Sequence, residues 1–318
     1  SIVRAWFDTD KVDVIADAPT SSVALALSQI TRDKNKVMLN SGAATSDLTG
    51  KACSPNTVHW TYDTWMLANS TGSAIVKTGG STWFFLTADY AFGHALERDT
   101  EAVVTKNGGK ILGKVRAPLN TQDFSSFLLQ AQASKAKIIG LANAGADTAN
   151  AIKQAVQFGL SGHGQQLAGI MMTLPDIRAL GLEQTQGMYL STTFYWDRTD
   201  ATRAFAKELA SRNKGLYPDA QQAGVYSAVL HYAKAIEKAG TDDGTKVIAT
   251  MKTIPTDDPL FGPGRVREDG RKIHPIYLMQ VKKPSESKGL YDFYKEVGAT
   301  PAEQAFQPIE QGGCPLVK

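Results

Sequence analysis

Strand-like and helix-like segments alternate along almost the whole chain, and this alternation restricts the possible fold more than any other feature. Short runs rich in β-branched and aromatic residues are interleaved with stretches whose apolar residues recur at helical spacing. The runs lie at residues 12–15, 36–39, 83–86, 111–115, 137–141, 167–171, 187–190 and 274–281, and the helical stretches at 21–30, 92–106, 124–133, 147–158 and 220–239. This pattern predicts an α/β fold built on doubly wound parallel sheets.

Length and charge narrow the class of protein. The 318 residues, 42% of them hydrophobic, are enough for two domains. The net charge of +3 comes from interspersed Lys and Arg without a basic run, so no nucleic-acid partner is expected. No window is long and apolar enough for a membrane span, and the first residues lack a signal-peptide layout. We therefore expect a soluble protein whose export signal has been removed.

The first seven residues look like the interior of an amphipathic helix, because no N-cap precedes their apolar positions. A doubly wound lobe normally opens with a strand. The chain is thus expected to begin inside a domain, with an N-terminal strand-helix-strand portion missing.

Enzyme signatures are absent from the sequence. It has no Gly-x-Ser-x-Gly elbow, no phosphate loop, no Gly-x-Gly-x-x-Gly after a strand and no His-Glu-x-x-His. The five histidines are scattered, and Asp257 and Asp258 lie in a turn bounded by prolines. We therefore predict a protein that is not an enzyme and has neither a cofactor nor a metal site.

The two cysteines, Cys53 and Cys314, are far apart in sequence. They are either two buried thiols or one long-range disulfide formed in an oxidising compartment. We favour the disulfide, because the Gly-Gly-Cys-Pro end of the chain has little else to hold it.

Two neighbouring strands each end in small hydroxyl residues that open a helical segment, at residues 15–22 and 39–47. Such junctions lie at the carboxyl edge of a parallel sheet, where free backbone N–H groups and hydroxyls favour anions. Each junction by itself is also an ordinary helix cap. Together they suggest a site for a carboxylate.

The chain resembles the Leu/Ile/Val-binding branch of the periplasmic receptors that serve ABC transporters. The resemblance spans nearly the whole length and rests on the order of several motifs: APTSS at residues 18–22, NSGAATSDLT at 40–49, ADYAFG at 88–93, DFS at 123–125 and a helix ending in QFG at 151–159. In that family two α/β lobes joined by hinge crossings close over a small ligand.

The resemblance implies roles for individual residues. Ser22 matches the serine whose hydroxyl meets the ligand carboxylate, and Ala43 and Thr45 match further carboxylate contacts. Phe92 and Gln221 fall at wall positions, and Ala144 stands where an aromatic is common. The full set of expected ligand contacts is Ser21, Ser22, Ala43, Ala44, Thr45, Tyr90, Phe92, Asn143, Ala144, Met171 and Gln221.

One departure from the family bears on the ligand. Receptors for amino acids carry an acid in the strand-to-loop segment after Leu167 to pair with the ligand ammonium, but this chain has Ile170, Met171 and Met172 there. An unpaired buried ammonium is costly, whereas methionines suit an apolar or aromatic body. We therefore expect a small aromatic or apolar carboxylate, such as a benzoate-like acid.

The resemblance also implies an organisation and a role. The first lobe is expected to hold residues 1–61, 194–259 and 286–318, and the second 62–193 and 260–285, which brings both cysteines into the first lobe. The expected function is a periplasmic solute receptor whose partner is an ABC permease. The alternatives are a branched-chain amino-acid binder and the ligand-sensing domain of a receptor or regulator.

Overall fold

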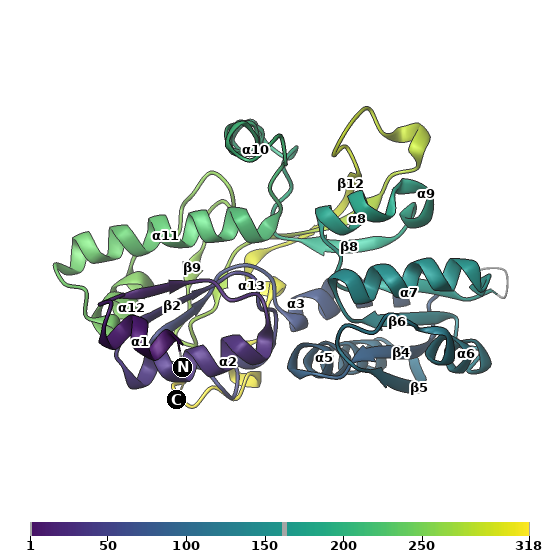
Figure 1. The fold of residues 1–318 in the computed structure, drawn as a ribbon, viewed down its shortest axis with the longest axis horizontal. Helices are drawn as coiled ribbons and strands as arrows, with labels where there is room; N and C mark the ends of the chain where they lie inside the picture. Colours follow the sequence, from purple (N-terminus) through teal and green to yellow (C-terminus); the bar gives the residue numbers. More distant parts are fainter. Residues whose placement is uncertain (1, 161–163, 318) are drawn as a thin grey trace. The chain divides into compact units, whose positions relative to one another are not determined.

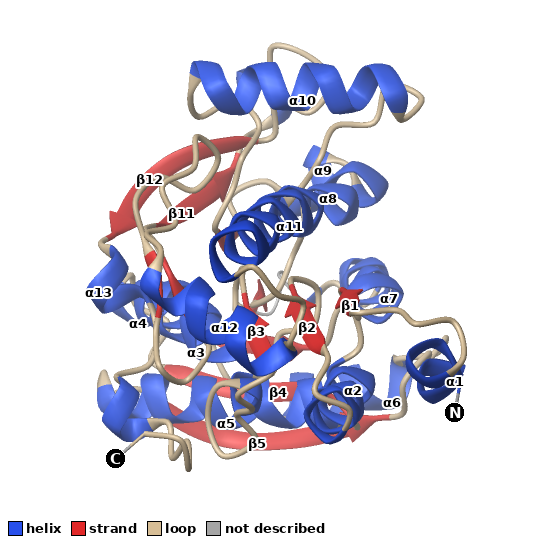
Figure 2. Cartoon of the chain, turned by 90° about the vertical axis from the view of Figure 1, so that its left-hand side faces the viewer, coloured by secondary structure: helices blue, strands red, loops and turns tan. Residues whose placement is uncertain are grey.

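The computed structural model describes residues 2–160 and 164–317 (Figure 1). The chain divides into two compact units, each assembled from segments that are distant in sequence. Unit 1 contains Ser1–Asp63, Thr193–Ile276 and Pro301–Lys318, and unit 2 contains Thr64–Thr192 and Tyr277–Thr300. Figure 2 distinguishes the helices from the strands of both units.

Unit 1 is built on a short parallel sheet in the order β1-β2-β3, accompanied by a two-stranded antiparallel ribbon of β9 and β10. Its strands are β1 (Val14–Ala16), β2 (Val37–Asn40), β3 (Thr57–His59), β9 (Arg265–Val266) and β10 (Lys272–Ile273). Its helices are α1 (Ile2–Asp8), α2 (Ser21–Asp33), η1 (Ser46–Leu48), α10 (Asp200–Arg212), α11 (Ala220–Ala239), α12 (Gly244–Thr253), α13 (Ala302–Ala305) and η5 (Ile309–Gln311).

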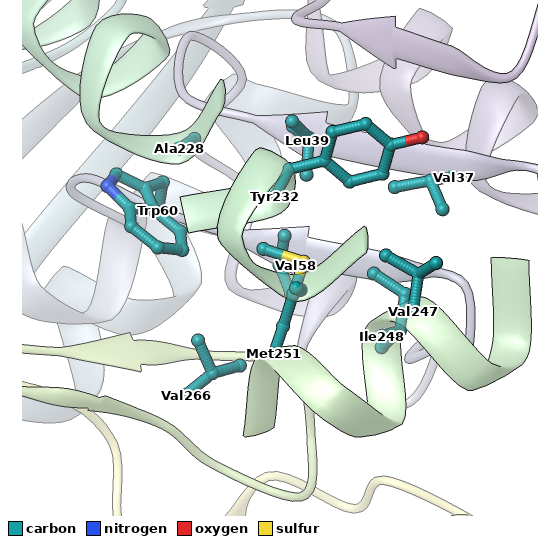
Figure 3. Packing of buried hydrophobic residues seen from close by; sticks show 11 residues of the cluster. Val37, Leu39, Val58, Trp60, Ala228, Tyr232, Val247, Ile248, Met251 and Val266 are labelled. Atoms are coloured by element: carbon teal, nitrogen blue, oxygen red, sulfur yellow. The ribbon is translucent and has the colours of Figure 1, made fainter. Parts of the chain in front are cut away.

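Strand β2 shows why the sheet of unit 1 is a middle layer. Its side chains alternate between the two faces. Val37 and Leu39 pack with Trp60 in the cluster that includes side chains of α11 and α12, as Figure 3 shows. Met38 points the other way and packs with Phe7 of α1 and with side chains of α2. All four residues of β2 are buried, which explains the uninterrupted apolar run that marked this strand in the sequence.

The predicted end of the helix at 220–239 and the predicted disulfide are both confirmed in unit 1. Gly240 adopts a left-handed conformation with φ of 65° directly after α11, which glycine does at little cost. Cys53 and Cys314 form a disulfide with a Cα–Cα distance of 5.5 Å. Beside it the two segments approach so closely that a Cβ on Gly50 would lie 2.7 Å from the carbonyl oxygen of Gly312. The disulfide therefore holds the C-terminal segment against the segment that follows η1.

Unit 2 contains a four-stranded parallel sheet in the order β5-β4-β6-β7 and a three-stranded sheet in the order β12-β11-β8. Its strands are β4 (Thr82–Ala88), β5 (Lys110–Ala117), β6 (Ile138–Ala142), β7 (Gln166–Gly169), β8 (Tyr189–Thr192), β11 (Ile276–Val281) and β12 (Tyr294–Thr300). Its helical segments are α3 (Thr64–Leu67), η2 (Ala68–Gly72), α4 (Ser73–Lys77), α5 (Ala91–Lys106), α6 (Ser125–Ala133), α7 (Gly145–Gln157), α8 (Leu174–Leu180), α9 (Leu182–Thr185) and η4 (Pro284–Glu286).

The predicted α/β class is confirmed, because parallel sheets with intervening helices form the centre of each unit. The parallel pattern does not extend to every strand. β8 pairs antiparallel with β11, and β12 lies on the other side of β11. Residues 294–300 did not stand out as a strand in the sequence because β12 is an edge strand in which only Tyr294 is buried.

The predicted lobe limits differ from these units by one or two residues at 62–63 and 193, and by longer segments in two further places. Residues 260–276 belong to unit 1, because the buried Arg271 guanidinium contacts the Asp63 carboxylate at 3.3 Å and Lys272 is buried against Trp60. Residues 286–300 belong to unit 2, because β12 completes the sheet that β11 and β8 begin. The first of these limits depends on buried charged residues and the second on the pairing of an edge strand. Neither feature appears as an apolar pattern in the sequence.

Candidate functional site

In unit 1 the predicted carboxylate contacts lie on the loop of residues 40–45, which leaves the carboxyl end of β2 and leads into η1. The loop is joined to the start of α2, since the N–H of Thr45 donates to Oγ of Ser21 at 3.2 Å. Ser21 is buried, whereas the neighbouring Ser22 is exposed. Ser21 therefore has a bonding role within the unit, and Ser22 presents its hydroxyl outward from the second position of α2.

The expectation that the backbone N–H groups of this loop are free is wrong for Ser41 and Gly42. Both donate to Oδ1 of Asp17, at 2.9 and 2.7 Å. Asp17 directly follows β1 and has a φ of 87°, a conformation that Asp and Asn adopt more readily than most other residues. Two of the N–H groups of the loop are thus already bonded to a carboxylate of the protein itself.

The close contact between Asp17 and the loop explains why residue 42 is a glycine. A Cβ at that position would lie 2.8 Å from Oδ2 of Asp17 and 3.0 Å from Cα of Pro19. The carbonyl oxygen of Gly42 accepts a hydrogen bond from the Tyr62 hydroxyl at 3.1 Å, and Nε2 of Gln221 donates to the same hydroxyl. Gln221, predicted as a wall residue, is thereby connected to the loop through Tyr62.

The remaining members of the loop are held just as firmly. Nδ2 of Asn40 donates to the carbonyl oxygen of Ala43 at 2.7 Å, and Oγ1 of Thr45 accepts from the N–H of Asp47 at 3.3 Å. Ala43 and Ala44 are buried. Because a hydroxyl both accepts and donates, Thr45 can still donate its proton to a ligand oxygen. The loop therefore presents a fixed set of peptide and hydroxyl groups.

In unit 2 the predicted residues follow the carboxyl ends of three adjacent strands. Strands β4 and β6 are neighbours, and the connection from β4 leads to β5 on one side while the connection from β6 leads to β7 on the other. Open α/β sheets bind ligands at such a switch point. Tyr90 and Phe92 follow β4, while Asn143 and Ala144 follow β6, so these residues flank the switch point.

Tyr90 and Phe92 form an aromatic pair at the start of α5, with ring centroids 5.9 Å apart. Phe92 is buried, and burial together with the charge of Asp147 raises the pKa of Tyr90 to about 12, which keeps its hydroxyl protonated. The first turn of α5 lies directly on the end of β4, because a Cβ on Gly93 would fall 1.9 Å from the carbonyl oxygen of Ala88. Gly93 thus determines where the aromatic pair lies.

At the end of β6, Asn143 is buried and Ala144 is partly buried at the start of α7. Oδ1 of Asn143 accepts from the Thr148 hydroxyl at 2.6 Å. Among the described residues Nδ2 of Asn143 has no hydrogen-bond partner.

The segment after β7 is apolar, as Met171 and Met172 are both buried. The next acid along the chain, Asp176, is engaged in capping α8. Its Oδ2 accepts from the N–H of Thr173 at 2.8 Å and from the Thr173 hydroxyl at 2.7 Å. Burial raises the pKa of Asp176 despite these hydrogen bonds. This acid is therefore committed to the helix, and the segment offers no separate carboxylate.

The structure thus brings the predicted residues together as two sets, one in each unit. The set in unit 1 is a bonded group with Ser22 beside it, and its members are Ser21, Ala43, Ala44, Thr45 and Gln221. The set in unit 2 follows adjacent strands and consists of Tyr90, Phe92, Asn143, Ala144 and Met171. Sequence reasoning missed Asp17 and Tyr62. The position of Asp17 after a strand was a usable signal, whereas nothing in the sequence connects Tyr62 with Gly42.

Residues 2–160 and 164–317 contain no group of three or more His, Cys, Asp or Glu placed to hold a metal ion. Within the same ranges, no helix has both the length and the apolar character needed to cross a bilayer.

Comparison with known proteins identifies the class to which these two units belong. The sequence profile of the family described as periplasmic binding protein matches residues 1–289. The chain therefore belongs to the periplasmic binding protein family, in agreement with the predicted resemblance.

Individual relatives agree with this assignment. A periplasmic binding protein from Burkholderia mallei is 50% identical, with a TM-score of 0.97 over 100% of this chain and 84% of that one. A branched-chain amino-acid ABC transporter periplasmic ligand-binding protein from Burkholderia xenovorans is 39% identical, with a TM-score of 0.87 over the same shares. A Leu/Ile/Val-binding protein homolog from Brucella melitensis is 28% identical over 93% of this chain and 73% of its own length.

More distant structures share the fold. One is a solute-binding protein from R. palustris in complex with benzoate, which is 20% identical with a TM-score of 0.84 over 99% of this chain and 84% of that one.

Proposed function

We propose that this protein is the periplasmic solute receptor of an ABC importer and that it binds a small carboxylate with an aromatic or apolar body. Membership of the periplasmic binding protein family supports the receptor role. The receptor would bind its ligand without chemical change, exchange between open and closed forms, and present the closed form to a membrane permease. A ligand shifts such an equilibrium only by its differential affinity for the two forms.

The observation that carries the ligand class is the contrast between the two sets of residues. The Thr45 and Ser22 hydroxyls, beside the peptide groups of Ala43 and Ala44, are suited to a carboxylate. The N–H groups of Ser41, Gly42 and Thr45 already donate within unit 1. The segment after β7 offers the thioether side chains of Met171 and Met172, and its nearest acid caps α8. An α-amino acid would bring an ammonium group that this segment does not pair, at a cost of several kcal/mol.

Calorimetric titration with benzoate, cinnamate and leucine tests this proposal. We expect the aromatic acids to bind, and we expect Ser22→Ala to weaken benzoate binding about tenfold, because a hydrogen bond to a charged group contributes roughly 1.5 kcal/mol or more. Thr45→Ala should have a similar effect. The matched control is Ser126→Ala, because Ser126 is exposed at the second position of α6, as Ser22 is in α2.

Two results would contradict the proposal in different ways. Unchanged benzoate binding by both Ser22→Ala and Thr45→Ala would show that the carboxylate does not bind at these hydroxyls. Binding of leucine without binding of either aromatic acid would support the branched-chain amino-acid alternative, which the names of the Burkholderia xenovorans and Brucella relatives favour.

A further inference from the structure

Asp17 is a built-in anion at the loop where the proposed ligand carboxylate binds. Its backbone continues the edge of the sheet, since its N–H donates to the carbonyl oxygen of Leu39 at 2.8 Å. Its side chain then reaches the loop beyond the next strand, where Oδ1 accepts from the N–H groups of Ser41 and Gly42. The negative charge is therefore held in place by two peptide groups.

Side chains also bind the carbonyl oxygens of the same two residues. The Thr61 hydroxyl donates to the carbonyl oxygen of Ser41 at 2.5 Å, and the Tyr62 hydroxyl donates to that of Gly42 at 3.1 Å. The Asp17 carboxylate lies where a side chain at residue 42 would otherwise begin. The N–H and carbonyl groups of Ser41 and Gly42 therefore all have partners within unit 1. A ligand carboxylate is left with Ala43 and Ala44, the Thr45 hydroxyl and Ser22, because the N–H of Thr45 already donates to Oγ of Ser21.

The ligand must then bind within one or two residues of a fixed negative charge. A like charge at that range disfavours each negative charge that a ligand brings, and partial screening by solvent limits the effect. A monoanion gains enough from the peptide and hydroxyl groups to offset its repulsion by Asp17. A dianion has two negative charges, and Asp17 repels both. We propose that Asp17 is a specificity-determining residue that restricts this site to ligands with a single negative charge. This inference rests on the proposed function, because it assumes a carboxylate bound at the 40–45 loop.

Asp17→Asn is the sharpest variant for a test. Asparagine retains an acceptor oxygen for the N–H groups of Ser41 and Gly42, and it tolerates a positive φ as aspartate does. It removes the charge and puts an amide NH2 in place of Oδ2. Asp10→Asn is the matched control, because it removes an exposed charge from the turn between α1 and β1 of the same unit.

The ligands form a series of equal ring size and rising charge, namely benzamide, benzoate and phthalate. Relative to wild type, Asp17→Asn should leave benzamide binding unchanged, strengthen benzoate binding about threefold and strengthen phthalate binding about tenfold. Titration calorimetry at low ionic strength measures all three. Asp10→Asn should leave the ratio of phthalate to benzoate affinity within about twofold of wild type.

The wild-type protein supplies a measurement that does not depend on the folding of a variant. Raising the salt concentration from about 20 mM to about 500 mM screens the repulsion, so phthalate affinity should rise relative to benzoate affinity. If wild type binds benzoate but Asp17→Asn leaves the phthalate-to-benzoate ratio unchanged, the role of Asp17 is overturned and the proposed function stands. If wild type binds none of the carboxylates tested, the proposed function fails and this inference fails with it.

Discussion

The two units place very different surfaces at the carboxyl edges of their parallel sheets. In unit 1 the 40–45 loop is fastened by side chains from β1 to α11, with Asp17, Tyr62 and Gln221 bonded to or through it. In unit 2 the strand ends carry the Tyr90 and Phe92 rings and buried methionines. Hydrogen bonds are directional and apolar contacts are not. The comparison therefore contrasts a directional, polar surface in unit 1 with an apolar, aromatic surface in unit 2.

The two units also differ in the structure around these surfaces. Unit 1 has a sheet of only three short strands, and it adds a disulfide and two buried cations, Arg271 and Lys272. Unit 2 has a four-stranded sheet whose strand β6 is buried throughout. Unit 1 therefore adds covalent and polar links to its sheet. Each of the following experiments addresses this difference.

Removal of the disulfide should have the largest effect and should act on unit 1 alone. In the Cys53→Ala, Cys314→Ala double variant we expect the free energy of unfolding of unit 1 to fall by about 4 kcal/mol, because the disulfide closes a long loop. Hydrogen exchange measures the two units separately. The amides of β2 should lose protection, while those of β4 should keep it. Equal loss in both strands would contradict the contrast between the units.

The buried Lys272 should make the stability of unit 1 depend on pH. Its ammonium lies 4.7 Å from the Trp60 ring centre and 4.2 Å from that of Phe261, and burial lowers its pKa to about 8 from the ordinary 10.5. Between these two pH values the folded chain has released a proton that the unfolded chain still holds, so the contribution of Lys272 to stability rises with pH in this window.

We expect a gain on the order of 2 kcal/mol from this residue, measured as the free energy of unfolding at about pH 7.5 and about pH 10. Lys272→Met is the control, because it keeps the apolar stem and removes the titrating group. If the variant and wild type show the same change between the two pH values, Lys272 is not the source.

Met171→Glu should have a smaller effect on ligand binding, and because Met171 is buried the new carboxylate also lowers the stability of unit 2. A carboxylate at this position disfavours an aromatic acid and can pair with an ammonium, so benzoate affinity should fall about tenfold, which is about 1.4 kcal/mol, while leucine affinity rises. Met171→Leu is the control for the change in shape. A fall in benzoate affinity of the same size in both variants would mean that packing, not charge, explains the effect.

Much of the fold was predictable because it depends on local patterns. Buried strands such as β2 read as apolar runs, and Gly240 marked the end of α11 because its position requires a left-handed conformation. The limits of the two units were less predictable. Arg271 and Lys272 look like surface residues in a turn-rich segment, yet both are buried in unit 1. The spacing of apolar residues does not predict the burial of a charged residue, because that burial depends on the partners of the charge.

The same division applies to the candidate site. The sequence by itself determined the α/β class, the family resemblance and the strand ends at which Ser22, Thr45 and Phe92 lie, because these follow from residue type and spacing along the chain. Only the tertiary structure decided that Asp17 occupies the N–H groups of Ser41 and Gly42, and that Asp176 is held by its own helix. A side chain's hydrogen-bond partner depends on which segments the fold brings within about 3 Å, and that distance is not written in the order of residues.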